Sequence, residues 1–386
     1  MRLAIVTSLF PRPDDPHSGG FIYQTTNALQ HYADLKVICP QPSYQGSTGG
    51  TQEAEVWKEH KISIVPLWFS YPAVRLLSRP FNGASCARHL YPILRDLQPD
   101  LVLNYWLYPE GYAAVRVANK LGLPVIVGSR GSDLRRIRDP FTRMWVARTV
   151  RGADFVLTVS EDLRQHAIRM GAPPNGVRTI RNGCDGQVFH YRDQQEARRE
   201  LQLAGELELI VYVGRFDKAK GIAELCEAFA GLARERPQVR LSLIGYGAFQ
   251  AAMMSLLRGH SLENRVFTPG RLHSRQVAKW MQAGNLFCLP SHSEGCPNVV
   301  VEAIACGCPV VATNVGGTPE LVDAECGILV PAQDPPALLQ ALRTGLGRVW
   351  DRRGIASRKA RTWDHVARET FEVCEEVRSR KGVVAG

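Results

Sequence analysis

Short apolar runs recur along the chain and alternate with stretches of helical periodicity. Ten of these runs are rich in Val, Ile and Leu: LAIVTSL, LKVICP, DLVLNYW, PVIVGS, FVLTVS, LIVYVGR, RLSLIG, LFCLPS, PVVAT and GILVP. Alternation of this kind predicts βαβ units and therefore parallel sheets. Because the runs are continuously hydrophobic, helices should cover both faces of each sheet.

The series of strands is interrupted between residues 189 and 207, where the sequence is polar and charged. We interpret this segment as a linker between two doubly wound α/β domains, residues 1–190 and 191–365. The last segment, about 366–386, has apolar residues at near-helical spacing and is expected to form a helix that packs back on the first domain. In open α/β sheets, ligands bind beyond the carboxyl ends of the strands, so a ligand is expected in a cleft between the domains.

The composition is that of a packed globular protein, with 45% hydrophobic and 22% charged residues. No apolar run reaches the roughly 18 residues of a membrane-spanning helix, and MRLAIVTSLFPRP fits a buried strand better than a signal peptide. The ten cysteines lack the spacing of a zinc site and are expected to be free thiols. We therefore expect a cytoplasmic protein without a metal.

A positive charge excess points to an anionic partner: the formal net charge is +10. Between Arg130 and Arg151 there are seven arginines and only two acids, Asp133 and Asp139. Within this segment, PFTRMWVARTV has the composition of a helix lying on an anionic membrane, and equally that of a solvated helix with one apolar stripe facing its own core. Nucleic acid is not expected as a partner, because no recognition module accompanies the charge.

The stretch SHSEGCPNVVVEAIACG contains two glutamates, Glu294 and Glu302. A buried strand precedes it, so Glu294 lies in the loop that leaves the strand, and Glu302 falls near the first turn of the following helix. Asn298 is the expected N-cap of that helix and Gly307 its end. Backbone amides at such a helix start form a positive pole that suits a phosphate or a sugar hydroxyl.

Two further loops carry groups that could bind phosphate. VYVGRFDKAKG ends a strand and supplies Arg215 and Lys220, whose charges suit the two phosphates of a diphosphate. Near the N-terminus, Gly19 and Gly20 precede a helix, and paired glycines let backbone amides approach an anion closely.

Together these elements resemble the retaining glycosyltransferases of family 4, also called group 1, which have the two-domain GT-B fold. The matching pieces run through nearly the whole chain: HSGG, VGSRGSD, ADFVLTVS, IRNGCDGQVF, VGRFDKAKG, LIGYG, VFTPG, LFCLPS, EGCPNVVVEAIACGCPVVATNVGGTPELV, GILVPAQD and TWDHVA. WLYPEG and the Arg-Gly-Ser-Asp step at Arg130 resemble the subset of teichuronic acid and exopolysaccharide enzymes.

The resemblance implies roles for donor-binding residues. Arg215 and Lys220 would bind the diphosphate of a UDP- or GDP-linked sugar in place of a metal, and Gly19 and Gly20 would approach it from the other domain. Glu294 would hold hydroxyls of the donor sugar and Glu302 the ribose. The remaining donor contacts would come from Leu272, through its backbone beside the base, and from the amide-rich stretch Cys296, Pro297, Asn298 and Val299.

The resemblance also implies same-face transfer with retention, in which the departing phosphate helps to deprotonate the acceptor. Many relatives have a histidine where this chain has Arg130, which cannot act as a base at neutral pH. Arg130 is expected to bind a phosphate or an acidic acceptor while Asp133 orients a hydroxyl; alternatively the two form an ion pair that shapes the cleft.

The implied function is hexose transfer to a cell-surface polysaccharide or to a lipid-linked or acidic saccharide, at the inner face of the plasma membrane. Two other functions stay open. A sugar-nucleotide 2-epimerase shares the architecture, and a nucleotide-sugar-binding scaffold would have lost catalysis, although Arg215, Lys220, Glu294 and Glu302 are all present.

Overall fold

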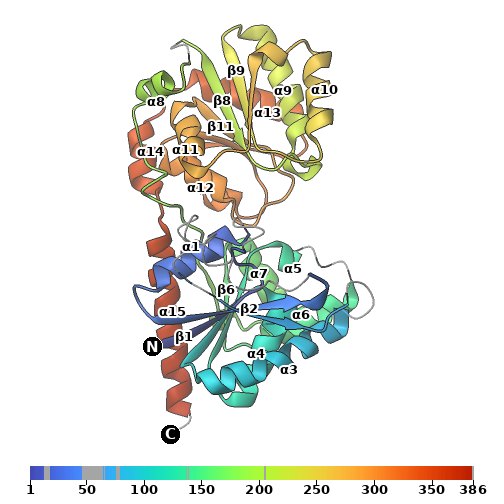
Figure 1. Cartoon of the computed structure of the whole chain (residues 1–386). Coiled ribbons are helices and arrows are strands. Elements are labelled where there is room, and N and C mark those ends of the chain that lie inside the picture. Colours follow the sequence, from blue (N-terminus) through green and yellow to red (C-terminus); the bar gives the residue numbers. More distant parts are fainter. Residues whose placement is uncertain are drawn as a thin grey trace. The chain divides into compact units, whose positions relative to one another are not determined.

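The computed structural model describes residues 1–12, 18–45, 64, 66–74, 79–135, 137, 139–203 and 206–384. The chain divides into two compact units (Figure 1). The first unit joins Met1–Arg181 to Trp363–Gly386, and the second is Asn182–Thr362. These boundaries replace the expected ones at 190/191 and 365/366.

The charged segment after Phe189 is not a linker but part of the second unit. It contains helix α8 (Gln194–Glu200), in which Ala197 and Arg198 are buried. Arg198 donates hydrogen bonds to the Ala283 carbonyl at 3.1 Å and to Asn285 Oδ1 at 2.5 Å. These contacts with residues far along the chain dock the polar helix, which a sequence pattern does not reveal.

The first unit contains a parallel sheet of seven strands in the order β3-β2-β1-β4-β5-β6-β7. The strands are β1 (Arg2–Val6), β2 (Asp34–Pro42), β3 (Leu67–Tyr71), β4 (Leu101–Tyr105), β5 (Val125–Ser129), β6 (Phe155–Thr158) and β7 (Val177–Thr179). The described helices are α1 (Gly20–Leu29), α3 (Arg79–Leu97), α4 (Tyr112–Leu121), α5 (Ser132–Arg135), α6 (Pro140–Gly152), α7 (Glu161–Arg169) and α15 (Trp363–Val384).

Helices cover both faces of this sheet (Figure 1). On one face, α15 and α1 pack together, and Val366, Val373 and Val377 of α15 share a core with Leu3 and Ile5 of β1. On the other face, α3, α4 and α6 contact one another. The C-terminal helix α15 is therefore part of the first unit, although the whole second unit separates it from the rest in sequence.

The second unit contains a parallel sheet of six strands in the order β10-β9-β8-β11-β12-β13. The strands are β8 (Glu208–Val213), β9 (Val239–Ile244), β10 (Val266–Gly270), β11 (Leu286–Leu289), β12 (Val310–Thr313) and β13 (Gly327–Val330). Besides α8, the helices are α9 (Ile222–Glu235), α10 (Gln250–Gly259), α11 (Ser274–Ala283), α12 (Asn298–Ala305), α13 (Pro335–Gly347) and α14 (Arg352–Lys359).

The α/β class with two parallel sheets is confirmed, and each of the ten apolar runs overlaps a strand. In each sheet the strand order reverses once, between β1 and β4 in the first unit and between β8 and β11 in the second. Ligands of such sheets bind beyond the carboxyl ends of the strands at this reversal. Within the described ranges, no helix combines the length and the apolar character needed to cross a bilayer.

Candidate functional site

The loop after β8 presents two cations at the strand reversal of the second sheet. Tyr212, buried at the end of β8, donates its hydroxyl to the Arg215 carbonyl at 2.9 Å, and the Arg215 side chain is exposed. Asp217 caps a short turn, Lys218–Lys220, by accepting from the Ala219 amide at 3.0 Å. The loop is therefore held at both ends while Arg215 and Lys220 keep access to a ligand.

This loop packs tightly against the loop after β11. The His292 amide donates to the Ala219 carbonyl at 2.9 Å. Gly221 has a φ of 68°, and a Cβ there would lie 1.9 Å from the Pro290 carbonyl oxygen, so only glycine fits. The two loops bring Lys220 Nζ within 2.7 Å of Glu294 Oε1. Two predicted donor-site residues, 74 positions apart in sequence, therefore meet at the strand reversal.

A second side-chain pair joins the same loops, and the sequence analysis missed it. His292 Nε2 lies 2.7 Å from Glu224 Oε1, in the first turn of α9, and both side chains are largely buried. Because α9 begins directly after Gly221, this pair ties the start of α9 to the loop that carries Glu294. No motif in the sequence marks the two residues as partners.

Helix α12 begins one residue earlier than the N-cap assignment requires. Pro297 is the N-cap, and Asn298 is the first helical residue. Asn298 Oδ1 accepts from Asn182 Nδ2 at 2.8 Å, and Asn182 Nδ2 also donates to the Cys296 carbonyl at 3.2 Å. The Asn298 side chain is thus engaged outside the helix, and the expected N-cap role was wrong. The amides of Asn298 and Val299 still form the N-terminal pole of α12.

Glu302 is the fifth residue of α12 and is half-buried. Burial raises the pKa of its carboxyl to about 7, and no neighbouring group offsets this shift. A carboxyl so poorly solvated is stabilised in its charged form by any hydroxyl that donates to it. This environment is compatible with the predicted contact to a ribose.

Leu272 lies in the turn between β10 and α11, partly buried against the core of the second unit. Strand β10 is at the edge of the sheet, and β9 separates it from β8. The structure therefore places Leu272 at the carboxyl edge of the sheet but away from the Lys220–Glu294 pair.

In the first unit, Gly19 and Gly20 differ in what they contribute. Gly19 has a φ of 59°, and a Cβ there would lie 2.2 Å from the Leu9 carbonyl oxygen, so the turn into α1 requires glycine. Gly20 begins α1 and has open space where its Cβ would be. His17 of the same motif, and Arg136 and Arg138 of the basic segment, lie outside the described residues.

Asp133 is buried at the start of α5, after β5. Its Oδ1 accepts from Ser129 Oγ at 3.0 Å and from the amides of Gly131 at 2.9 Å and Arg130 at 3.1 Å, and its Oδ2 accepts from the Leu107 amide at 3.3 Å. Burial raises the pKa of this carboxyl, while the same hydrogen bonds oppose the shift. The geometry favours a role in holding the turn, and the contact with an acceptor hydroxyl stays a prediction.

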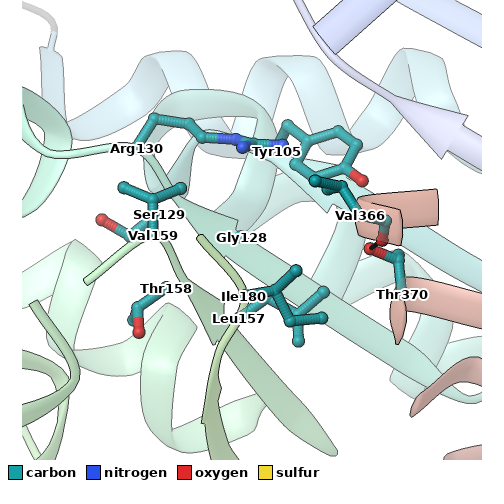
Figure 2. A pocket seen from close by; sticks show the side chains of 10 residues that line it. All are labelled: Tyr105, Gly128, Ser129, Arg130, Leu157, Thr158, Val159, Ile180, Val366 and Thr370. Atoms are coloured by element: carbon teal, nitrogen blue, oxygen red, sulfur yellow. Dashed lines mark hydrogen bonds between the residues drawn. The ribbon is translucent and has the colours of Figure 1, made fainter. Parts of the chain in front are cut away.

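Arg130 lies beside two aromatic rings. Its guanidinium carbon is 4.4 Å from the ring centre of Tyr105 and 5.4 Å from that of Phe21. Figure 2 shows Arg130 and Tyr105 bordering a small pocket at the carboxyl ends of β4, β5 and β6, closed on one side by Val366 and Thr370 of α15. The described contact between Arg130 and Asp133 runs through the Arg130 amide rather than through its side chain.

Glu110 is a buried carboxyl at the strand reversal of the first sheet that the sequence analysis used only as part of WLYPEG. Glu110 is 1% exposed. Its Oε1 accepts a hydrogen bond from the Ser8 amide at 3.1 Å and another from the Ser8 hydroxyl. Its Oε2 has no hydrogen-bond partner among the described residues. Burial, with a smaller repulsion from Asp133, raises the pKa of Glu110 to about 7.

All ten cysteines are buried, and none of them forms a disulfide. Within the described ranges, no group of three or more His, Cys, Asp or Glu side chains is placed to hold a metal ion.

Comparisons with known proteins show the family of the chain. Residues 22–183 match the model of the glycosyl transferase 4-like domain, and residues 193–348 match that of glycosyl transferases group 1. The chain is 30% identical over 319 residues to the D-inositol 3-phosphate glycosyltransferase of Jonesia denitrificans, covering 73% of each protein. It is 28% identical over 354 residues to TuaC of Bacillus subtilis, whose name assigns it to teichuronic acid biosynthesis as a glycosyltransferase; the match covers 89% of this chain and 88% of TuaC.

The fold has counterparts among solved structures. HepE from Anabaena, in complex with UDP-glucose, superimposes with a TM-score of 0.73 at 18% identity, covering 97% of this chain and 100% of HepE. The two parallel sheets with flanking helices match this GT-B architecture. The chain therefore belongs to the group 1 glycosyltransferases and is an enzyme of that kind with the GT-B fold.

Proposed function

We propose that this glycosyltransferase moves a hexose from a UDP- or GDP-linked sugar to a cell-surface polysaccharide or lipid-linked acceptor, with retention of configuration and without a metal. The observation that carries the proposal is the contact between Lys220 and Glu294 at the strand reversal of the second sheet. One group suits a phosphate and the other suits sugar hydroxyls, so a sugar diphosphate is the ligand that satisfies both.

Each donor part has a proposed partner. Arg215 and Lys220 bind the diphosphate and stabilise it as a leaving group, with the N-terminal pole of α12 beside them. Donor binding then replaces the Lys220–Glu294 contact, because Glu294 accepts from hydroxyls of the sugar. Glu302 accepts from the ribose. The contributions of Gly19, Gly20 and Leu272 to the same ligand also remain proposals.

The reaction we propose needs no side-chain nucleophile. The departing phosphate takes the proton of the acceptor hydroxyl on the face from which the phosphate leaves, and the enzyme contributes charge stabilisation and positioning. Two carboxylates flanking the reacting carbon, as in glycosidases, are not part of this mechanism. The names of HepE complexes with UDP and UDP-glucose support a uridine donor.

The proposed acceptor is a lipid-linked or acidic saccharide, with Arg130 as its partner. The guanidinium lies partly exposed beside the pocket of Figure 2, where it could meet an anion. The name of TuaC supports polysaccharide assembly. We place the protein at the inner face of the plasma membrane, with an anionic membrane surface as a partner.

Replacing Lys220 or Glu294 by Ala tests the donor site. Each variant should lose at least about a hundredfold in kcat/KM for sugar transfer, because a group that stabilises the leaving charge or the sugar is absent. Lys218→Ala is the matched control: it removes an exposed cation from the same turn and should transfer normally. Full activity of Lys220→Ala or Glu294→Ala, with unchanged thermal unfolding, would reject this site.

Two further measurements address the reaction class. Transfer should persist after dialysis against EDTA, and loss of transfer that added Mg²⁺ or Mn²⁺ restores would contradict the metal-independent reaction. Incubation with donor alone should leave the sugar nucleotide largely intact; its conversion to an epimer would assign the chain to the epimerases instead.

A further inference from the structure

Helices α3 and α4 pack side by side on one face of the first unit (Figure 1). Side chains of these two helices line a basic groove. The groove has a volume of about 320 Å³ and a floor of small apolar side chains. Its rim consists of Arg88 and Tyr91 from α3 and of Arg116 and Lys120 from α4. It is not one of the two strand reversals discussed above.

The three cations of the groove have no counter-charge among the described residues. Within the part of the chain that the structure describes, no carboxylate lies within salt-bridge distance of Arg88, Arg116 or Lys120, whereas Arg95 on the same helix pairs with Asp96 at 2.8 Å. Lys120 Nζ instead lies 4.5 Å from the ring centre of Tyr91. Since Arg116 and Lys120 are one turn apart on α4, their repulsion destabilises the helix unless an anion is bound.

The positive charge extends over the whole helix layer. The ranges 81–97, 112–121 and 140–152 together contain seven Arg and Lys residues and one acid, Asp96. Any anion that meets this face is therefore attracted over the area of three helices rather than at one point.

Apolar side chains are exposed beside these charges. Phe81 near the start of α3 is 70% exposed, and Phe141 and Met144 on the first turns of α6 are 58% and 39% exposed. The ring of Trp145 on α6 packs edge-on against Tyr112 of α4, with 4.7 Å between the ring centres. The exposed apolar side chains and the basic groove therefore belong to the same three packed helices, α3, α4 and α6.

We propose that the α3–α4 groove binds phosphate headgroups of an anionic phospholipid bilayer, with Phe141 and Met144 entering the interface beside it. Proteins that bind membrane interfaces combine two kinds of side chain. Basic side chains contact the lipid headgroups, and aromatic or aliphatic side chains enter the boundary of the acyl chains. A site for free phosphate would require the cations but not the exposed Phe81, Phe141 and Met144. The proposal deepens the membrane part of the proposed function and does not depend on the donor site.

Vesicle flotation with the full chain tests it. The protein should bind vesicles of phosphatidylcholine mixed with phosphatidylglycerol and should bind pure phosphatidylcholine only weakly. Arg116→Gln with Lys120→Gln should weaken binding to the mixed vesicles roughly thirtyfold, because each basic residue near an anionic surface contributes about fivefold. Arg2→Gln with Lys36→Gln removes the same charge from the strands of the same unit and should change binding less than about twofold.

Two further measurements distinguish binding to a lipid bilayer from binding to free phosphate. Phe141→Ser with Met144→Ser should also weaken binding, and inorganic phosphate at the same ionic strength as a chloride control should not displace the protein. Equal binding to both vesicles, an unchanged groove variant, or displacement by phosphate alone would each overturn the proposal. Vesicle binding is measured without donor, so its outcome does not depend on sugar transfer. The variant Arg116→Gln with Lys120→Gln should still transfer sugar to a water-soluble acceptor, so failure of the membrane proposal and failure of the proposed function can be told apart.

Discussion

At the scale of single residues, two carboxyls stand out because burial raises their pKa to about 7: Glu302 in the second unit and Glu110 in the first. Only Glu302 was expected to touch a ligand. Glu110, with one oxygen on Ser8 and the other without a described partner, resembles it in environment but carries no motif that marks it. Its burial depends on the loops after β1 and β4 meeting at the strand reversal, which the sequence does not encode locally.

Glu302 leads to a pH dependence of donor affinity. Below its pKa the carboxyl is neutral and accepts poorly from a ribose diol; above it, the carboxylate accepts both hydroxyls. Affinity for a UDP-sugar should therefore rise as the pH increases through about 7, and titration calorimetry at several pH values measures it. A sugar nucleotide is the suitable probe because its diphosphate has no ionisation in this range, unlike that of free UDP.

The control is Glu302→Gln, which keeps the shape and removes the ionisation. This variant should bind the donor about tenfold more weakly at high pH, since a hydrogen bond to a charged group is lost, and its affinity should vary little with pH. A wild-type affinity that is flat across pH 7, or a variant with the same pH profile as the wild type, would disprove the ribose contact.

At the scale of elements, the proposed donor site depends on two loops that pack against each other after β8 and β11. Three contacts join them: the His292 amide to Ala219, the close approach of Gly221 to Pro290, and the ion pair of Lys220 with Glu294. The His292–Glu224 pair adds a fourth contact at the start of α9. The position of Lys220 is thus a property of both loops rather than of its own sequence.

Gly221→Ala should separate these loops. The left-handed backbone conformation costs a non-glycine residue about 1–2 kcal/mol, and the clash with the Pro290 carbonyl adds to it. We expect a lower Tm and a donor KM raised at least about tenfold, both measured on the full chain.

Gly259→Ala provides the comparison. Gly259 ends α10, has no positive φ, and has no atom within 4 Å of a Cβ placed there. It should unfold at the wild-type temperature or slightly above and transfer normally. If both glycine variants behaved alike, the tight packing of the two loops would not control the site.

At the scale of the whole molecule, the two units differ in the number of chain segments that form them. The second unit is one continuous segment, Asn182–Thr362, with its own core around β8, β9 and β11. The first unit needs two segments, because α15 returns to cover the face of the sheet next to α1.

Residues 182–362 expressed alone should therefore fold and bind a UDP-sugar, whereas residues 1–181 alone should not reach a stable fold. Circular dichroism during heating should show a cooperative transition for the second fragment, and calorimetry should detect donor binding that Lys220→Ala abolishes. For residues 1–181, adding Trp363–Gly386 through a flexible linker should restore cooperative unfolding. A cooperative transition of 1–181 without α15 would contradict the assignment of α15 to that core.

Much of the fold was readable from local pattern, and the misses have physical causes. Strand β7 has only three residues, β3 lies at a sheet edge with exposed positions, and β10 carries a proline, so none forms a continuous apolar run. Helix α8 was interpreted as a linker because its sequence is polar. Its Arg198 is buried through hydrogen bonds to distant carbonyl groups, and such bonds leave no apolar pattern in the sequence.

The sequence by itself determined the α/β class and ten of the thirteen described strands, and it marked the loops that carry the proposed donor-site residues, because hydrophobic period, loop chemistry and motif spacing are properties of neighbouring residues. Only the tertiary structure decided which of these residues meet: that Lys220 contacts Glu294, that Pro297 rather than Asn298 occupies the N-cap position of α12, that Glu110 is buried, and that α3 and α4 enclose a basic groove. Strand order and helix packing bring together residues tens of positions apart, and the energy of those contacts depends on the whole fold.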